Sequence, residues 1–67
     1  MNYYDRVVLA AIDQSPGADL PLITLLTHFK PGFVRRKLAD LVLRNFVIES
    51  NGRYRLQPGV DDAIRKP

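Results

Sequence analysis

The stretch FVRRKLADLVLRNFVIESNGRYRL, residues 33–56, decides the fold, because a helical hydrophobic pattern in it changes into a two-residue alternation. Val34, Leu38 and Leu41 recur at spacings of four and three residues, which places them on one side of a helix together with Asn45. The pattern predicts a helix with one face on the core and the other face free for a partner.

The second half of this stretch predicts a β-hairpin. Two short β-prone runs, residues 47–50 and 53–56, flank Asn51-Gly52, which is the strongest short hairpin signal. In the second run apolar residues alternate with arginines, so one face of the hairpin can pack on the core while the other meets solvent or a ligand. The core-facing pair is Tyr54 and Leu56, and the outward pair is Arg53 and Arg55.

A first helix is expected from near Asn2, whose side chain can cap it, to just before Ser15-Pro16-Gly17. Residues 7–12 are apolar around nearly the whole circumference of this helix, more than one small core needs. Two interpretations stay open. Either the domain wraps this helix on two sides, or the helix also makes a subunit contact through residues such as Leu9 and Ala10.

A second helix is expected from about Pro21 to Phe29, with Asp19 close enough to cap it. Ala18 to Leu20 forms either a brief strand or the lead into this helix. Leu22, Leu25, Leu26 and Phe29 are the expected inward side chains of the helix, and Thr24, Thr27 and His28 are the expected outward ones.

Lys30-Pro31-Gly32 interrupts the helical pattern, because the residue before Pro avoids the α region and Gly permits a sharp reversal. The third helix then runs from about Gly32 to Arg44, and Asn45 stands where a left-handed residue ends a helix. After the hairpin, a short last helix is expected to follow Pro58-Gly59.

Length and composition point to a single small domain that spans residues 1–67. The chain has no Cys and one His, so neither disulfides nor a metal site are expected. No cofactor or enzymatic activity is expected either, since His28 has no Ser or carboxylate suitably spaced to work with it. The longest apolar run, residues 7–12, is too short to span a bilayer, and no secretion signal precedes it. A soluble, cytoplasmic protein is therefore expected.

The positive charge is unevenly distributed along the chain. Residues 30–55 hold seven Lys and Arg against two Asp and Glu, a net charge of +5, whereas the rest of the chain carries −2. Such asymmetry favours a surface for a polyanion, although a charged helix face that only meets solvent is the alternative.

The order helix, short extended piece, helix, tight turn, helix, hairpin resembles the winged helix-turn-helix family, over about residues 4–65. Two segments carry the resemblance. VRRKLADLVLRNFVIE, residues 34–49, is similar to the recognition helix and its exit, with Asn45 in place of the usual Gly. RYRLQPG, residues 53–59, is similar to the end of the wing. The expected fold is thus α+β, with three helices, a C-terminal hairpin wing and a short last helix.

The resemblance implies that the third helix enters the major groove of duplex DNA, that the second helix braces on the backbone and that the wing touches a neighbouring phosphate or the minor groove. Arg35 and Arg36 are the candidates for guanine, because a guanidinium can bond both acceptors of its major-groove edge. The other groove-facing candidates are Gly32, Phe33 and Ala39. The phosphate candidates are Lys30, Lys37, Thr24, Thr27 and His28, with Arg53 and Arg55 for the wing.

The expected function is sequence-specific duplex DNA binding by a small transcriptional regulator, with a homodimer through the first helix as a further expectation. Leu43 and Phe33 lie off the core stripe and put apolar groups on the presumed reading face. The alternative function is therefore a winged-helix protein-interaction module that uses the first helix and Leu43. Binding to RNA is disfavoured, because no exposed sheet with stacking aromatics is expected.

Overall fold

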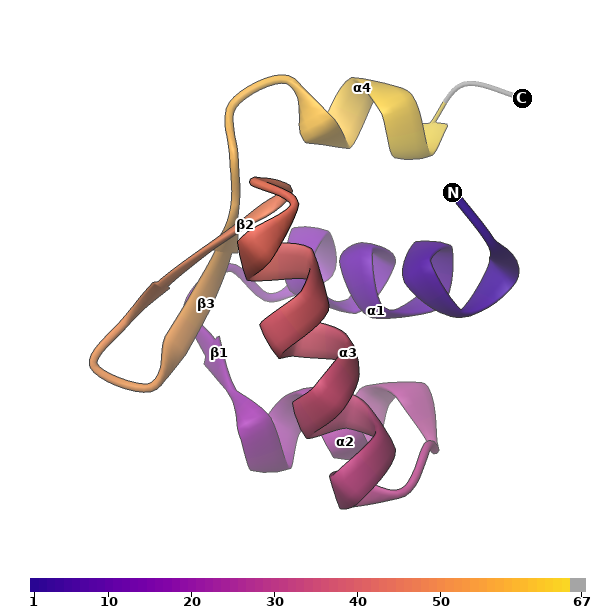
Figure 1. The fold of residues 1–67 in the computed structure, drawn as a ribbon, viewed down its shortest axis with the longest axis vertical. Coiled ribbons are helices and arrows are strands. Elements are labelled where there is room, and N and C mark those ends of the chain that lie inside the picture. The colour runs from indigo at the N-terminus through magenta and orange to yellow at the C-terminus, as the bar shows by residue number, and fades with distance from the viewer. Residues whose placement is uncertain (66–67) are drawn as a thin grey trace.

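Four helices and a three-stranded antiparallel sheet make up residues 1–65, the part of the chain that the computed structural model describes (Figure 1). The sheet has the strand order β1-β3-β2, so the third strand lies in its centre. The fold is thus a small α+β domain. In chain order the elements are α1 (Tyr3–Gln14), β1 (Ala18–Asp19), α2 (Leu20–Thr27), α3 (Pro31–Leu43), β2 (Val47–Ser50), β3 (Arg53–Leu56) and α4 (Val60–Arg65).

Side-chain caps set the starts of the first two helices. At α1 the backbone N–H of Asp5 donates to Asn2 Oδ1 over 2.8 Å, and the Asp5 carboxylate accepts from the Asn2 N–H over 3.4 Å. At α2 the Leu22 N–H donates to Asp19 Oδ1 over 3.1 Å. Each cap satisfies N–H groups that have no partner inside the helix, as the sequence predicted.

The reversal between α2 and α3 differs from the prediction. His28 makes it, with a left-handed backbone at φ 62°, and Lys30 is the N-cap of α3. Pro31, which was expected to form the turn, lies instead in the first turn of α3 beside Gly32, the expected first residue of the helix. Pro is well accommodated there, because the first N–H groups of a helix need no partner within the helix.

The hairpin and the exit of α3 follow the prediction. Asn45 has φ 64° just after α3, and Asn51 and Gly52 both have positive φ, as a tight type I′ turn requires. This turn pairs Ser50 with Arg53, and the register continues along both strands to Val47 opposite Leu56.

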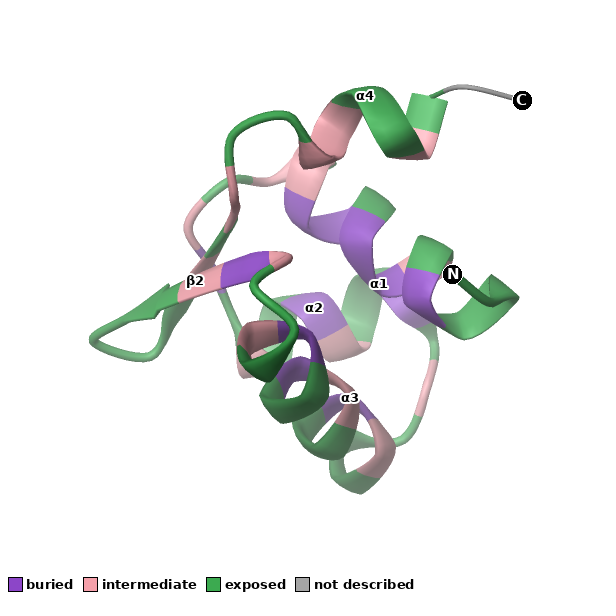
Figure 2. Cartoon of the chain, turned by 45° about the horizontal axis from the view of Figure 1, so that its top comes forward, coloured by how far each residue is buried: buried purple, intermediate pink, exposed green. Residues whose placement is uncertain are grey.

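The core lies between α1, α2, α3 and the sheet (Figure 2). α1 contacts α2, α3, β3 and α4, which explains why it is apolar on several sides. Leu9, expected to be available for a subunit contact, is fully buried, so that expectation is wrong for this residue. Of residues 7–12, Ala10 is exposed and Val7 is half-buried. The fully or almost fully buried apolar residues are Val8, Leu9, Ala11, Ile12, Ala18, Ile23, Val34, Leu38, Leu41 and Val47.

The orientation of α2 is another correction. Ile23 and Thr27, one turn apart, are buried, whereas Leu22, Leu25 and Leu26 are exposed and the inward assignment of these leucines was wrong. α2 has no charged side chain, so its own periodicity cannot choose the buried face. Packing against α1 and α3 makes the choice.

Candidate nucleic-acid interface

The outward face of α3 changes character along its length. The residues of its buried face are Val34, Leu38 and Leu41, and those of its exposed face are Gly32, Arg35, Arg36, Ala39, Asp40 and Leu43. Charge on the exposed face is positive near the start of the helix. Toward the end of the helix the exposed face carries the acidic Asp40 and the apolar Leu43, whose side chain is 81% exposed.

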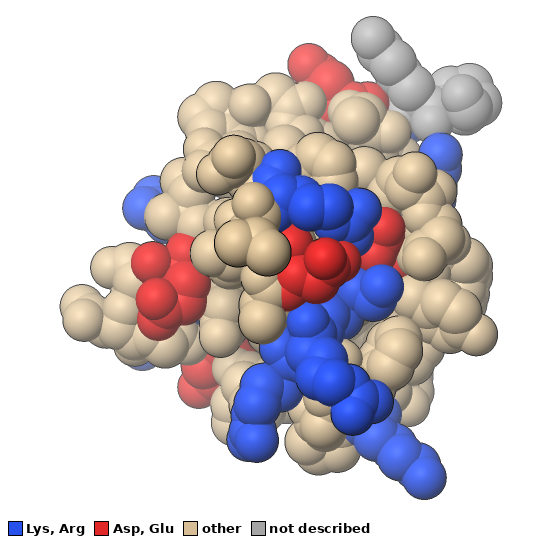
Figure 3. Space-filling view, viewed as in Figure 1, with Lys and Arg blue, Asp and Glu red and all other residues tan. Residues whose placement is uncertain are grey.

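Basic side chains gather over the N-terminal half of α3 (Figure 3). Within residues 1–65, no carboxylate lies within 4.0 Å of the charged groups of Lys30, Arg35 or Arg36, and all three residues are exposed. Their charge is therefore available to an anion. The helix also starts without a side-chain cap, which leaves its first N–H groups free for solvent or a ligand.

Asp5 is the buried centre of an ion-pair network between α1 and α3. Its side chain is 3% exposed, with Oδ1 2.9 Å from Lys37 Nζ and Oδ2 3.0 Å from Arg44 Nη2. The same Arg44 atom lies 2.6 Å from Asp40 Oδ2. Burial by itself raises the pKa of the Asp5 carboxyl, but hydrogen bonds from Lys37, from Arg44 and from the backbone of Asn2 more than offset it. The pKa of Asp5 consequently lies below its ordinary value.

This network removes Lys37 from the phosphate candidates. Its ammonium group is largely buried and bonded to Asp5, so a contact with DNA would have to break a buried ion pair. The long Lys37 side chain reaches the Asp5 carboxylate from the edge of the buried face of α3. Sequence spacing alone did not reveal the partner, because Asp5 and Lys37 belong to different helices.

The threonines of α2 also leave the candidate interface. Thr27 is buried, where its hydroxyl donates to the Thr24 carbonyl and accepts from the Phe29 N–H, both over 3.3 Å. The Thr24 hydroxyl oxygen is shielded from solvent and has no hydrogen-bond partner within the described chain. Both corrections follow from the rotation of α2. His28 remains exposed beside the start of α3.

The hairpin presents an acidic group, not an arginine, toward α3. Glu49 and Tyr54 line a shallow hollow with Arg35 and Ala39 of α3, and the Glu49 carboxylate accepts from the Gly52 N–H over 2.7 Å. Figure 3 shows acidic side chains over the hairpin on the face of the molecule that carries α3. Glu49 was not among the predicted site residues, although its position in the predicted alternation could have placed it opposite Tyr54.

The two hairpin arginines lie on the other face of the sheet, as the alternation along β3 requires. Arg53 donates from Nη1 to the Gly17 carbonyl over 3.3 Å, near the tip of the hairpin. Arg55 lines a separate hollow with Asp13 and Asp61. Both residues are exposed, and Arg53, the first residue of β3, lies nearer the tip of the hairpin than Arg55 does.

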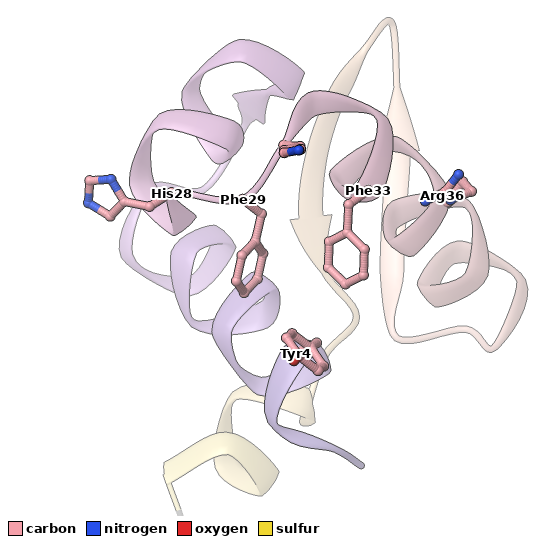
Figure 4. Close-up of a pocket in the computed structure, with 6 residues that line it drawn as sticks. Tyr4, His28, Phe29, Phe33 and Arg36 are labelled. Carbon is pink, nitrogen blue, oxygen red and sulfur yellow. The ribbon is translucent and has the colours of Figure 1, made fainter.

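An aromatic cluster beside the start of α3 was missed by the sequence analysis. The rings of Tyr4, Phe29 and Phe33 point toward one another, with centroids 5.2–5.7 Å apart (Figure 4). A hollow of about 510 Å³ lies over them and is also lined by His28, Lys30 and Arg36. The cluster joins Tyr4 of α1 to Phe29 and Phe33, which lie four residues apart, so no local pattern could have indicated the contact with Tyr4. Phe33, a predicted groove residue, is half-buried in it.

Comparison of the chain with protein-family models, with curated proteins and with solved structures finds no match. Within residues 1–65, each helix falls short of the length and apolar character needed to cross a membrane. The assignment of a function therefore rests on the geometry and charge described above.

We expect Asp5→Asn to lower the free energy of unfolding by about 1–3 kcal/mol at pH 7, because it removes the buried ion pair with Lys37 and the charge-assisted hydrogen bond from Arg44. The pKa of Asp5 is depressed in the folded state, so its stabilising contribution is present above about pH 4 and is lost as the pH falls through the folded pKa. The difference between wild type and variant should therefore shrink below about pH 4.

Urea unfolding followed by circular dichroism between pH 2 and pH 7 measures this difference. Asp40→Asn is the matched control, since it removes an exposed partner of the same Arg44 and should cost less than about 1 kcal/mol. Equal losses for the two variants at pH 7 would contradict the central role of Asp5.

Proposed function

We propose that this chain is a winged helix-turn-helix domain that binds duplex DNA in a sequence-specific manner and regulates transcription by occupying a short site. The observation that carries the proposal is the exposed positive charge of Lys30, Arg35 and Arg36, unpaired within residues 1–65, at the start of a helix that follows a tight turn. The order of helices and the position of the β2–β3 hairpin, the proposed wing, agree with this family.

In the proposed complex the N-terminal half of α3 lies in the major groove. Arg35 and Arg36 project from its exposed face, where a planar guanidinium can bond guanine O6 and N7 together. Gly32 and Ala39 are small neighbours on the same face, which allows the helix backbone to come close to the bases. Lys30 and His28 flank this face at the preceding turn and contact phosphates, which sets the position of the helix.

The C-terminal half of α3 leaves the groove in this proposal. Asp40 would repel phosphate, but Arg44 neutralises it, and Leu43 carries no charge to favour contact with the backbone. Of the hairpin residues, Arg53 contacts an adjacent phosphate from the tip, and Arg55 makes no contact. The proposed interface is therefore smaller than the net charge of residues 30–55 suggests.

Binding to a duplex should weaken steeply as salt is added. If Lys30, Arg35, Arg36 and Arg53 displace roughly four counterions, log K should fall with log salt at a slope of about −3.6, which is about 150-fold between roughly 50 and 200 mM. Fluorescence anisotropy titrations of a labelled duplex at several salt concentrations give this slope. A slope near zero would remove the electrostatic basis of the proposal.

The two arginines of α3 should differ from those of the hairpin in what their removal costs. Of the single substitutions Arg35→Ala and Arg36→Ala, at least one should remove a base contact. That variant should lose about 1–3 kcal/mol of binding free energy on the preferred site and less on random DNA. Arg55→Ala is the matched control, since it removes the same charge from the other face of the sheet and should leave affinity nearly unchanged.

The preferred site comes from selection of a randomised duplex pool, and affinities come from the same anisotropy titration. Arg53→Ala should weaken binding to all sequences alike, because a phosphate contact carries no sequence information. If Arg55→Ala weakens binding as much as the α3 substitutions do, then net charge rather than the α3 face determines affinity.

A second candidate function, protein interaction or self-association, is favoured by exposed leucines. Leu25 is 67% exposed on a face of α2 that also carries Leu22 and Leu26, and Leu43 is more exposed still. An apolar patch of this kind is typical of an interaction surface. These leucines lie in two places, on α2 and at the end of α3, and the exposed large apolar side chains of α1 are Tyr3 and Tyr4.

If this surface drives self-association, sedimentation at tens of micromolar should give a dimer for the wild type and a monomer for Leu25→Glu. Leu25 is exposed, so this substitution should leave the fold intact, unlike Leu9→Glu, which would place a charge in the core. Leu43→Glu tests the other exposed site in the same way. A wild type that stays monomeric would leave these leucines as ordinary exposed residues.

A further inference from the structure

We infer that the hollow over Tyr4, Phe29 and Phe33 binds an unpaired DNA base, with the phosphate of that nucleotide held by the cations at its rim. The inference deepens the proposed function, on which it rests: the DNA would be a duplex with a single-stranded extension at the end bound beside α3. The hollow itself is described by residues and distances that do not depend on that function.

The rings form a partly open surface for stacking. Interplanar angles of 58°, 71° and 80° mean that no two of the three rings stack face to face. An edge-to-face pair leaves ring faces without an aromatic partner, and Tyr4 is 49% exposed. Every base has a flat π face, so such a platform accepts an unpaired base whatever its sequence.

Positive charge surrounds this apolar floor. Lys30 and Arg36 are exposed at the rim, and His28 borders it with its ring pointing away from the aromatic cluster (Figure 4). Among residues 1–65, no acidic side chain lines the hollow. An aromatic floor with a cationic rim matches the two parts of a nucleotide, a planar base and an anionic phosphate.

The position of the hollow joins it to the proposed duplex site. Lys30 and Arg36 belong both to the rim and to the basic N-terminal half of α3. The hollow is open at the surface, since Tyr4, Lys30 and Arg36 are all exposed, so a base that remains attached to a DNA strand can enter it. A nucleotide just beyond the last base pair is the one that this geometry can reach.

Three kinds of DNA test the inference on the wild-type protein: a blunt duplex, the same duplex with a short unpaired extension that carries 2-aminopurine, and the single strand alone. The extension is placed at the 5′ end in one duplex and at the 3′ end in another. One stacked base should raise the affinity for at least one extended duplex about tenfold over the blunt duplex. Stacking on the rings should also change the 2-aminopurine fluorescence on binding.

Tyr4→Leu is the decisive variant, because leucine keeps apolar contact with Phe29 and Phe33 but has no flat ring. It should lose the roughly tenfold gain on the extended duplex and keep the affinity for the blunt one. Tyr4→Phe should restore the gain. Tyr3→Leu is the matched control, since Tyr3 is an exposed tyrosine that does not line the hollow; its ring packs edge-on against Tyr4 with centroids 5.5 Å apart, so the control also shows what loss of that contact alone does.

Equal affinities for blunt and extended duplexes, or a gain that Tyr4→Leu retains, would overturn the inference. Failure of the proposed duplex function is a separate result: the blunt duplex would not bind, while the single strand would still bind with a fluorescence change that depends on Tyr4. Absence of binding to all three DNAs would overturn both.

Discussion

The ion pairs of Asp5 with Lys37 and Arg44 connect the start of α1 to the middle and the end of α3. A buried carboxylate is costly unless every oxygen is bonded, so two cations of α3 must face α1. The same carboxylate accepts from the Asn2 N–H in the cap of α1. Helix capping and the rotation of α3 about its axis are therefore coupled through one side chain. That rotation leaves Arg35 and Arg36 at the surface.

This network also divides the basic residues of the chain into two groups. Lys37 and Arg44 neutralise carboxylates inside the protein, whereas Lys30, Arg35 and Arg36 have no such partner among the described residues. Net charge over residues 30–55 overstates what a polyanion can meet. The surface available to the proposed DNA partner is a short one, at the start of α3, and the acidic hairpin residue beside Arg35 limits its extent toward the proposed wing.

Two groups of apolar side chains that the core does not cover have different surroundings. The leucines of α2 have no charged residue on their own helix, which suits contact with another protein. The aromatic cluster of Tyr4, Phe29 and Phe33 is bordered by cations, which suits an anionic planar group. The two surfaces support different partners for this reason. The aromatic cluster adjoins the proposed DNA-binding face, so the duplex at α3 and the unpaired base at the cluster can belong to the same DNA.

Local chemistry in the sequence determined the helix caps at Asn2 and Asp19, the left-handed Asn45, the Asn51-Gly52 turn and the core stripe of α3, because each depends on residues within a few positions of one another. Only the tertiary structure decided which face of α2 is buried, since that helix is apolar nearly all round. It likewise decided the pairing of Lys37 with Asp5, the burial of Thr27 and Leu9, and the meeting of Tyr4 with Phe29 and Phe33. These contacts join segments distant along the chain, and their energies depend on how whole helices pack rather than on any local pattern.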